Sequence, residues 1–265
     1  MTILKKEDKR MIEFFRYFFG KGEQIEFKLF TLAHFIPVLL TIIIILLIFK
    51  FRENLANLKH EKAIRMGLGF ALIIAEMAYY WRITAMPSLG SSPYTDLPIS
   101  ICGWVLIFSC FLVNNKSQTL YDIIYFWLFS GTLLAVITPT AISYTGPTRF
   151  RYYQFWAAHT LGYIALFYMT FVHKMRPNWK SMAKSGIALF ILAMIATLAN
   201  NILGPGANYL YMASVEETAS LLNLLPKNYW LKMLVLAVVV GTMFFLAYLP
   251  WFVKDFRQKR KIVEK

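Results

Sequence analysis

Residues 42–48 read Ile-Ile-Ile-Ile-Leu-Leu-Ile, inside a longer run, 31–49, that contains no Asp, Glu, Lys or Arg. About 20 apolar residues are enough for a helix to cross the hydrocarbon core of a bilayer. The whole chain has the same character, because 58% of its residues are hydrophobic and only 16% are charged. A soluble domain carries roughly 25% charged residues. The sequence therefore predicts a membrane protein.

Six further windows are long and apolar enough to be candidate spans: 63–83, 97–113, 120–140, 152–173, 182–203 and 231–253. Only helices and closed barrels satisfy the backbone inside a bilayer. Continuous apolar runs lack the alternation of barrel strands. We therefore expect an all-α membrane protein, a seven-transmembrane-helix bundle formed by residues 31–253. An interfacial amphipathic segment, 1–30, precedes it, and a basic tail, 254–265, follows it.

The first segment mixes aromatic and charged residues over 11–19, as a helix in the plane of the membrane interface does. A cap packed against the bundle is the alternative interpretation.

The net charge is +14, and the basic residues are unevenly divided between the loops on the two sides of the predicted bundle. Loops on one side of the predicted bundle, with the tail, hold fifteen Lys and Arg residues, and the opposite loops hold five. The positive-inside rule then places the carboxyl terminus in the cytoplasm and, with seven spans, the amino terminus outside. This distribution favours a multi-pass protein of the cell membrane over a nucleic-acid-binding protein.

Several polar residues interrupt the spans at a similar depth. At ~1.5 Å per residue, His34, Glu76, Cys102, His159 and the pair Asn200-Asn201 all fall in the outer half of the predicted bundle. Ionisable residues within spans usually face the protein interior and indicate a functional site. The pattern predicts a cavity open to the outside or to the outer leaflet. Packing roles remain open for each residue, including interhelical hydrogen bonds for the asparagines.

Cys102 follows Asp-Leu-Pro-Ile-Ser-Ile, residues 96–101, which predicts a helix start with Pro98 in its first turn. A helix amino terminus favours the thiolate form of cysteine, and a histidine at the same depth is a suitable base. Cys110 lies eight residues further on, about 12 Å along a helix, so the two cysteines are too distant for a disulfide.

The chain resembles the YwaF-like integral membrane proteins of bacteria, whose eukaryotic relative is transmembrane protein 164. The resemblance covers most of the chain and rests on scattered landmarks: Phe-Thr-Leu-Ala-His at 30–34, Glu76 before Tyr79-Tyr80, Leu-Pro-Ile-Ser-Ile-Cys at 97–102, Phe126-Trp127 with Gly131, Thr138-Pro139, His159, Asn-Ile-Leu-Gly-Pro-Gly-Ala-Asn-Tyr at 201–209, and Ser-Leu-Leu-Asn at 220–223.

The resemblance implies a phospholipid acyltransferase that works through a cysteine thioester, with Cys102 and His159 as the catalytic pair. Glu76 or His34 would orient the imidazole, as the third member of a triad does. We expect substrate contacts from Arg149 and Arg151, as partners of a lipid phosphate, and from Asn200, Asn201, Asn208 and Tyr209. Membrane phospholipids are the expected partners.

Other function classes remain open at this stage. A transporter, or a lipid- or small-molecule-binding protein without catalysis, would also use such a cavity, although we find no inverted repeat of the kind many transporters have. A receptor and a scaffold are further alternatives. Two histidines and a glutamate could ligate zinc, but no HExxH spacing supports a metal, and no motif indicates a cofactor. Oligomeric state does not follow from the sequence.

Overall fold

The computed structural model describes residues 2–20, 27–139, 142, 145–213 and 224–263. In chain order the helices are α1 (Thr2–Phe19), α2 (Leu32–Lys50), α3 (Arg52–Ala56), α4 (Glu61–Ala85), η1 (Pro87–Leu89), α5 (Ile101–Asn115), α6 (Gln118–Trp127), η2 (Leu128–Thr132), α7 (Leu133–Ile137), α8 (Phe150–Phe171), α9 (Trp179–Leu203), η4 (Tyr209–Tyr211) and α10 (Tyr229–Val263). Within these described ranges no strand occurs, so the predicted all-α class is confirmed.

Among the described residues, five helical stretches are long and apolar enough to cross a membrane: α2, α4, the continuous stretch Gln118–Ile137, α9, and Tyr229–Gln258 of α10. Each corresponds to a predicted window. The other two windows also form helices, but α5 has only 15 residues, about 22 Å at ~1.5 Å per residue. The less apolar α8 is not among the five. The membrane character of the chain is established, whereas a count of seven spans stays a prediction.

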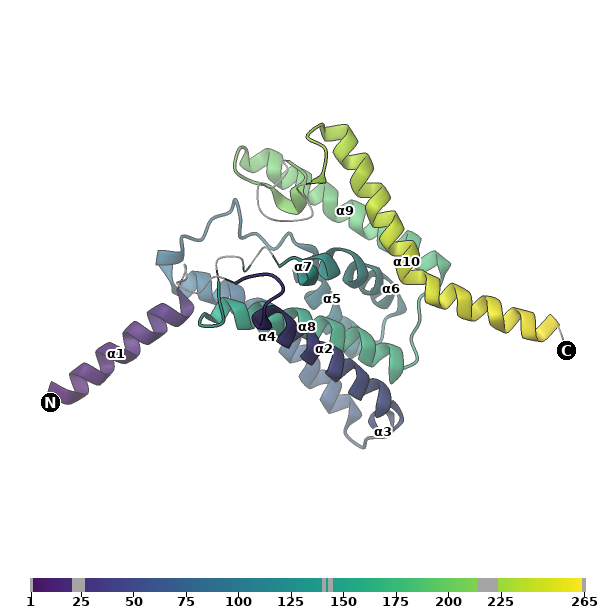
Figure 1. Ribbon diagram of the computed structural model, residues 1–265, viewed down its shortest axis with the longest axis horizontal. Coiled ribbons are helices and arrows are strands. Elements are labelled where there is room, and N and C mark those ends of the chain that lie inside the picture. Colours follow the sequence, from purple (N-terminus) through teal and green to yellow (C-terminus); the bar gives the residue numbers. More distant parts are fainter. Residues whose placement is uncertain (1, 21–26, 140–141, 143–144, 214–223, 264–265) are drawn as a thin grey trace.

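The bundle is built around α5 and α8. Helix α4 packs against both of them, α2 packs against α8, and α6 packs against α5 and α9 (Figure 1). Leu72, Val105, Leu106 and Leu166 are at most 1% exposed and belong to one core cluster. The outer faces of α2 and α9 carry exposed large apolar side chains instead, as surfaces in contact with lipid do.

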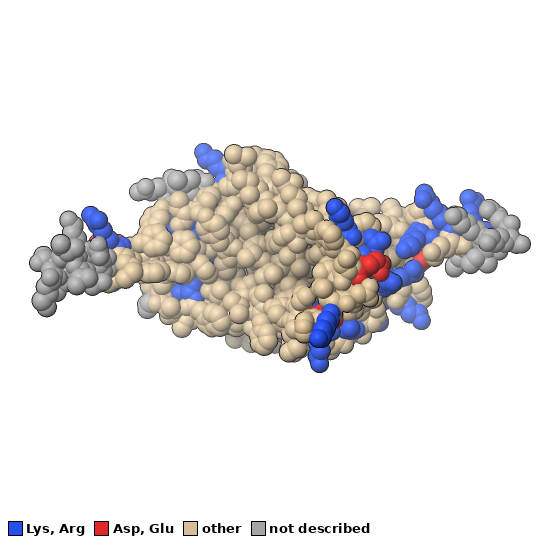
Figure 2. Space-filling view, turned by 90° about the horizontal axis from the view of Figure 1, so that it is seen from below, with Lys and Arg blue, Asp and Glu red and all other residues tan. Residues whose placement is uncertain are grey.

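Helix α10 is peripheral, and its contacts with the bundle include the Phe126–Phe244 ring pair, the Arg176–Asp255 ion pair and two hydrogen bonds of Tyr125 in α6. The Tyr125 hydroxyl donates to the Ala247 carbonyl oxygen at 2.8 Å and accepts from Trp251 Nε1 at 3.0 Å. The last turns of α10 project beyond the bundle and carry the predicted basic tail as a continuation of the helix (Figure 1). In Figure 2 the basic side chains gather mainly at this end of the molecule, beside a broad area without charged residues.

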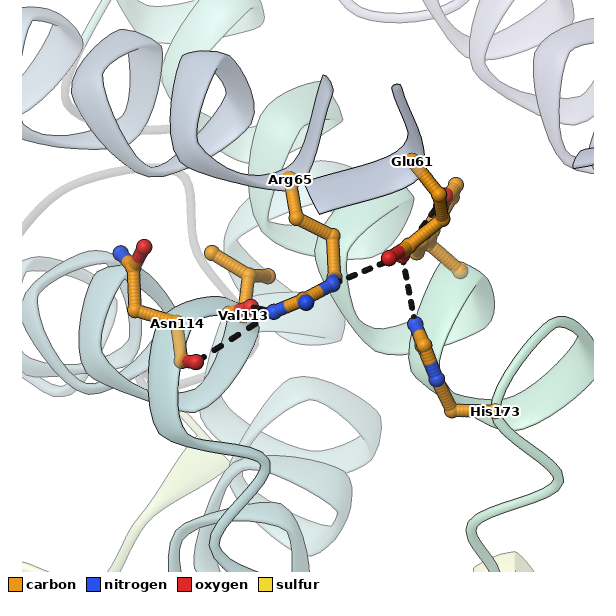
Figure 3. Close-up of polar contacts among 6 residues, drawn as sticks. Glu61, Arg65, Val113, Asn114 and His173 are labelled. Carbon is orange, nitrogen blue, oxygen red and sulfur yellow. Dashed lines mark hydrogen bonds and ion pairs between the residues drawn. The ribbon is translucent and has the colours of Figure 1, made fainter. Parts of the chain in front are cut away.

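A polar clasp joins α4, α5 and α8 at one end of the bundle (Figure 3). Glu61 Oε1 accepts hydrogen bonds from Arg65 Nε at 2.7 Å, His173 Nε2 at 2.8 Å and the Tyr168 hydroxyl at 3.2 Å. The Arg65 guanidinium also donates to the Val113 carbonyl oxygen in the last turn of α5. The carboxyl ends of α5 and α8 therefore meet at the start of α4, and these two helices run in the same direction.

Helix α1 projects away from the bundle, with its carboxyl-terminal turn against α8 (Figure 1). Two buried arginines bind the carbonyl groups at this end: Arg82 of α4 donates to the Phe19 and Gly20 oxygens, both at 2.7 Å, and Arg149 donates to the Tyr17 oxygen. Cations are favourable at the negative end of a helix dipole. Several apolar side chains of the projecting helix are exposed, among them Met11, Ile12, Phe14 and Phe15, and its place at the membrane interface stays a prediction.

Replacing Arg65 by alanine should lower the thermal unfolding temperature of the detergent-solubilised protein by several degrees. The Arg65 side chain is only 6% exposed, and removing one partner of a buried ion pair typically costs about 3–5 kcal/mol. Arg52→Ala is the matched control, because the Arg52–Glu53 pair is 38% and 64% exposed and such surface pairs contribute roughly 0–1 kcal/mol. Equal unfolding temperatures for the two variants would contradict the clasp.

Candidate functional site

Cys102 is the second residue of α5. The helix begins at Ile101 because Ser100 caps it, its side-chain oxygen accepting a hydrogen bond from the Gly103 amide at 3.0 Å. The prediction that Pro98 lies in the first helical turn is wrong: Pro98 precedes the cap, and serine takes the N-cap position that its side chain favours. The thiol nevertheless lies in the first turn, at the positive end of the helix dipole.

Charged and polar groups from α4, α8 and η2 surround this thiol. Glu76 and Arg151 both interact electrostatically with Cys102 and with each other. The Thr132 hydroxyl lies beside the thiol and is a buried oxygen without a hydrogen-bond partner among the described residues. The structure thus brings together three residues that the sequence analysis proposed separately, and it adds Thr132.

The Arg151 side chain is held inside the bundle. Its guanidinium donates to Gln154 Oε1 and lies over the Tyr79 ring, 4.6 Å from the ring centroid. Gln154 is itself fixed through the Ala75 carbonyl oxygen at 2.7 Å, and the Tyr79 hydroxyl donates to Asp96 Oδ1 at 2.7 Å. Arg151 is therefore placed among the candidate catalytic groups rather than at a lipid-facing entrance.

Glu76 approaches the start of α5 closely because residue 103 is glycine. A Cβ atom at Gly103 would lie 2.5 Å from Glu76 Oε1 and 3.0 Å from the Ser100 hydroxyl oxygen. Any other L-residue would meet the carboxylate at a distance that real Cβ atoms do not show. The carboxylate consequently lies against the first turn of α5, next to Cys102, where a helix favours negative charge.

His159 is buried, with 6% of its surface exposed. Its Nδ1 lies 2.7 Å from the Phe155 carbonyl oxygen, one turn earlier in α8. A carbonyl oxygen only accepts hydrogen bonds, so Nδ1 carries the proton, and in the neutral ring Nε2 is left with a lone pair. Nε2 is buried and has no hydrogen-bond partner among the described residues. This is the state that a general base requires.

The parallel directions of α5 and α8 place His159 at the level of Cys102. Further along the two helices, Gly162 faces Val105, because a Cβ at Gly162 would be 3.5 Å from Val105 Cγ1. Cys102 and His159 each lie three residues before this contact, about 4.5 Å back along their helices. Arg151 also acts electrostatically on both residues.

His34 does not join this group. Its Nε2 bonds to the Val136 carbonyl oxygen at 2.9 Å, and its Nδ1 accepts from the Phe30 amide at 3.2 Å. Both ring nitrogens are thus occupied by backbone groups, and the residue connects α2 to α7. Neither nitrogen is available in this arrangement to orient the His159 imidazole.

Asn200 and Tyr209 hold the loop after α9 together. Asn200 Nδ2 donates to the Tyr209 carbonyl oxygen at 3.1 Å, and Asn200 Oδ1 accepts from the Tyr209 amide at 2.8 Å. The Tyr209 hydroxyl donates to the Pro93 carbonyl oxygen at 2.6 Å and accepts from the Leu97 amide at 2.8 Å. Together they fasten the segment that leads into α5, so they support the position of Cys102 from outside the cluster.

The remaining predicted substrate contacts are dispersed. Asn201 is exposed, Asn208 Oδ1 accepts from the Ala213 amide at 3.1 Å, and Arg149 binds the end of α1. Their contribution to substrate binding stays a prediction. In the part of the chain that the structure describes, no group of three or more His, Cys, Asp or Glu side chains could hold a metal ion.

Thr132 and Gln154 were not among the residues predicted from the sequence, and Tyr79 was noted only as a landmark of the family resemblance. Thr132 ends η2, a π-helical turn that interrupts the helix between α6 and α7. Such turns occur frequently at functional sites. Gly131 permits the close approach of this turn to α5, since a Cβ there would lie 2.8 Å from Ile101 Cδ1. That glycine, noted before only as a landmark, was the available signal.

A comparison with known protein families shows which family this chain belongs to. The model of the TMEM164 family matches residues 29–248. The chain belongs to the TMEM164 family. The match covers α2 to α9 and most of α10, hence all residues of the cluster, and it confirms the resemblance inferred from the landmarks. The landmark at 220–223 lies outside the residues that the structure describes. Searches of curated proteins and of solved structures return no match.

Substituting Gly103 by alanine should displace the Glu76 carboxylate and lower the unfolding temperature, because added volume in a packed interior costs roughly 1–3 kcal/mol. The matched control is Gly67→Ala in α4, where an added Cβ meets nothing within 4 Å and should stabilise the helix by up to about 1 kcal/mol. Thermal unfolding in detergent micelles measures both. A Gly103→Ala variant as stable as Gly67→Ala would show that the carboxylate is not held against α5.

Proposed function

We propose that this member of the TMEM164 family is a membrane-embedded phospholipid acyltransferase, a transacylase that carries the acyl group as a thioester on Cys102. The observation that supports this best is the buried Nε2 of His159, which has no hydrogen-bond partner among the described residues, at the level of a cysteine in the first turn of α5. A nucleophile with an adjacent base whose other nitrogen is oriented by a third group is the arrangement used in covalent catalysis. Here the orienting group is the Phe155 carbonyl oxygen.

In the first half-reaction His159 Nε2 takes the proton of the Cys102 thiol. The sulfur attacks the carbonyl carbon of a phospholipid ester, a C–S bond forms and the ester C–O bond breaks. The departing alkoxide of the lysophospholipid receives the proton from the imidazolium. In the second half-reaction the neutral imidazole deprotonates the acceptor hydroxyl or amine, which attacks the thioester, and the thiolate leaves and recovers the proton. The same residue thus acts first as base and then as acid in each half.

Arg151 supplies the fixed positive charge in this scheme. Its electrostatic interaction with Cys102 stabilises negative charge on the sulfur and on the tetrahedral intermediate, because preorganised charges act strongly where water is excluded. Glu76 balances the guanidinium, so we assign to it a positioning role toward Arg151 rather than toward the imidazole. The Thr132 hydroxyl, which is near the thiol and has no hydrogen-bond partner among the described residues, would donate a hydrogen bond to the thiolate when it forms.

The orientation of the chain determines which lipids reach the site. The end of the molecule with most basic side chains (Figure 2) faces the cytoplasm by the positive-inside rule. Cys102 begins α5 and the clasp residue Val113 lies near its end, so the thiol occupies the opposite, outer half of the bundle. We therefore propose an outside amino terminus, seven spans and a donor phospholipid from the outer leaflet of the cell membrane.

An acyl-enzyme trapping experiment tests the proposal. Purified protein in lipid nanodiscs is mixed with a phospholipid carrying a labelled acyl chain, in the absence of an acceptor, and is quenched rapidly in acid because a thioester is less stable than the ester it came from. Intact-mass and peptide analysis should show one acyl adduct on Cys102 that neutral hydroxylamine removes. The Cys102→Ser variant should carry no hydroxylamine-sensitive adduct.

Cys110→Ser is the matched control, since Cys110 lies on the same helix, is partly buried and has a free thiol. This variant should form the adduct at the wild-type rate, and His159→Ala should form it roughly 100-fold more slowly or worse. Absence of any adduct, or an adduct that survives in Cys102→Ser, would refute the transacylase. Lipid binding without an adduct would favour the alternative of a transporter or lipid-binding protein.

A further inference from the structure

A groove of about 930 Å³ lies between α1 and the last turns of α4. Its walls are predominantly apolar and include Ile12, Phe15, Phe19, Ala78, Trp81 and Met86. Ligand pockets commonly occupy about 300–1,000 Å³ and combine apolar walls with a few polar groups. The groove has the volume and composition of a binding site.

The polar residues that line the groove are Arg16, Arg82 and Ser88, and the two arginines are the charged ones. Arg16 is exposed and makes no hydrogen bond or ion pair with the residues that the structure describes. Arg82 donates through Nε and one terminal nitrogen to the carbonyl groups at the end of α1. Its other terminal nitrogen can therefore donate a hydrogen bond to a ligand. None of the residues lining the groove is acidic. The site therefore favours an anionic group, and guanidinium pairs with phosphate are among the strong hydrogen-bonded ion pairs.

The groove faces the membrane interface. Helix α4 is a candidate membrane span, and Trp81, 57% exposed, lies four residues before its end. Tryptophan is enriched at the level of lipid headgroups. The other wall belongs to α1, whose apolar residues Ile12 and Phe15 are 50% and 49% exposed. A ligand here would have its charged part among headgroups and its apolar part among acyl chains.

The groove is separate from the Cys102 cluster. With about 100° of rotation per residue, Ala78, Trp81 and Ala85 lie on the side of α4 opposite Glu76. We propose that this groove binds one phospholipid, with its phosphate between Arg16 and Arg82 and an acyl chain along Trp81. The lipid completes the contact between α1 and α4 and holds the interfacial helix against the bundle. This site does not depend on thioester chemistry at Cys102.

Photolabelling of the full chain in nanodiscs tests the proposal. One probe is a glycerophosphocholine with a diazirine near the carbonyl end of one acyl chain; the other is the diacylglycerol with identical chains and no phosphate. The phospholipid probe should label peptides of α1 and of the end of α4 saturably, and the diacylglycerol should label them roughly tenfold less, the loss expected for one charge-assisted hydrogen bond.

Arg16→Gln and Trp81→Ala should each reduce groove labelling several-fold. Arg16→Gln should fold normally because its side chain is exposed and unpaired, and Phe190→Ala on α9, whose side chain is 66% exposed to the bilayer, should leave groove labelling unchanged. Equal labelling by the two probes, equal labelling of the groove and of α9, or labelling unaffected by Arg16→Gln would overturn the proposal. Crosslinks between two copies of the chain at the groove, found in place of lipid adducts, would also overturn the proposal.

Discussion

The charge of Arg151 inside a largely apolar bundle is the constraint on which the rest of the site depends. A charge removed from water must be paired or hydrogen-bonded where it lies. Gln154 accepts from the guanidinium, the Tyr79 ring lies beneath it, and Glu76 supplies the opposite charge. These partners come from α4 and α8, so neutralising Arg151 also fixes the relative positions of those two helices. The Cys102 thiol interacts electrostatically with both Glu76 and Arg151.

Two local departures from regular packing, and a polar cluster at the far end of the bundle, shape this site. Gly103 admits the Glu76 carboxylate to the first turn of α5, and Gly131 lets the π-helical turn η2 approach Ile101. The clasp around Glu61 holds α5 and α8 parallel at their far ends. A cysteine at the beginning of one helix and a histidine in the other therefore reach the same level. Rigid elements on several sides favour a preorganised site over one assembled by loop motion.

Much of this arrangement was predictable from sequence. The apolar windows located α2, α4, α5, α6, α8, α9 and α10, and the polar residues within them indicated Glu76, Cys102 and His159. The family match then confirmed the resemblance that the landmarks suggested. The sequence did not show which backbone carbonyl oxygens would form hydrogen bonds with the buried polar side chains. His34 and Arg149 resembled active-site residues, yet both bind backbone oxygens of distant segments. Such pairings depend on tertiary contacts, whereas the start of α5 at Ile101 is set locally by the Ser100 cap.

Proximity of Cys102 and His159 is the central claim, and bridging by a short bifunctional thiol reagent measures it directly. In a Cys110→Ser background, His159→Cys supplies the second thiol. We expect an intramolecular bridge between positions 102 and 159, detected by intact mass and peptide mapping. His173→Cys, which lies beyond the end of α8 at Phe171 and so more than roughly 18 Å of helix after His159, should give only two separately modified thiols. Separate modification in the His159→Cys protein as well would contradict the account.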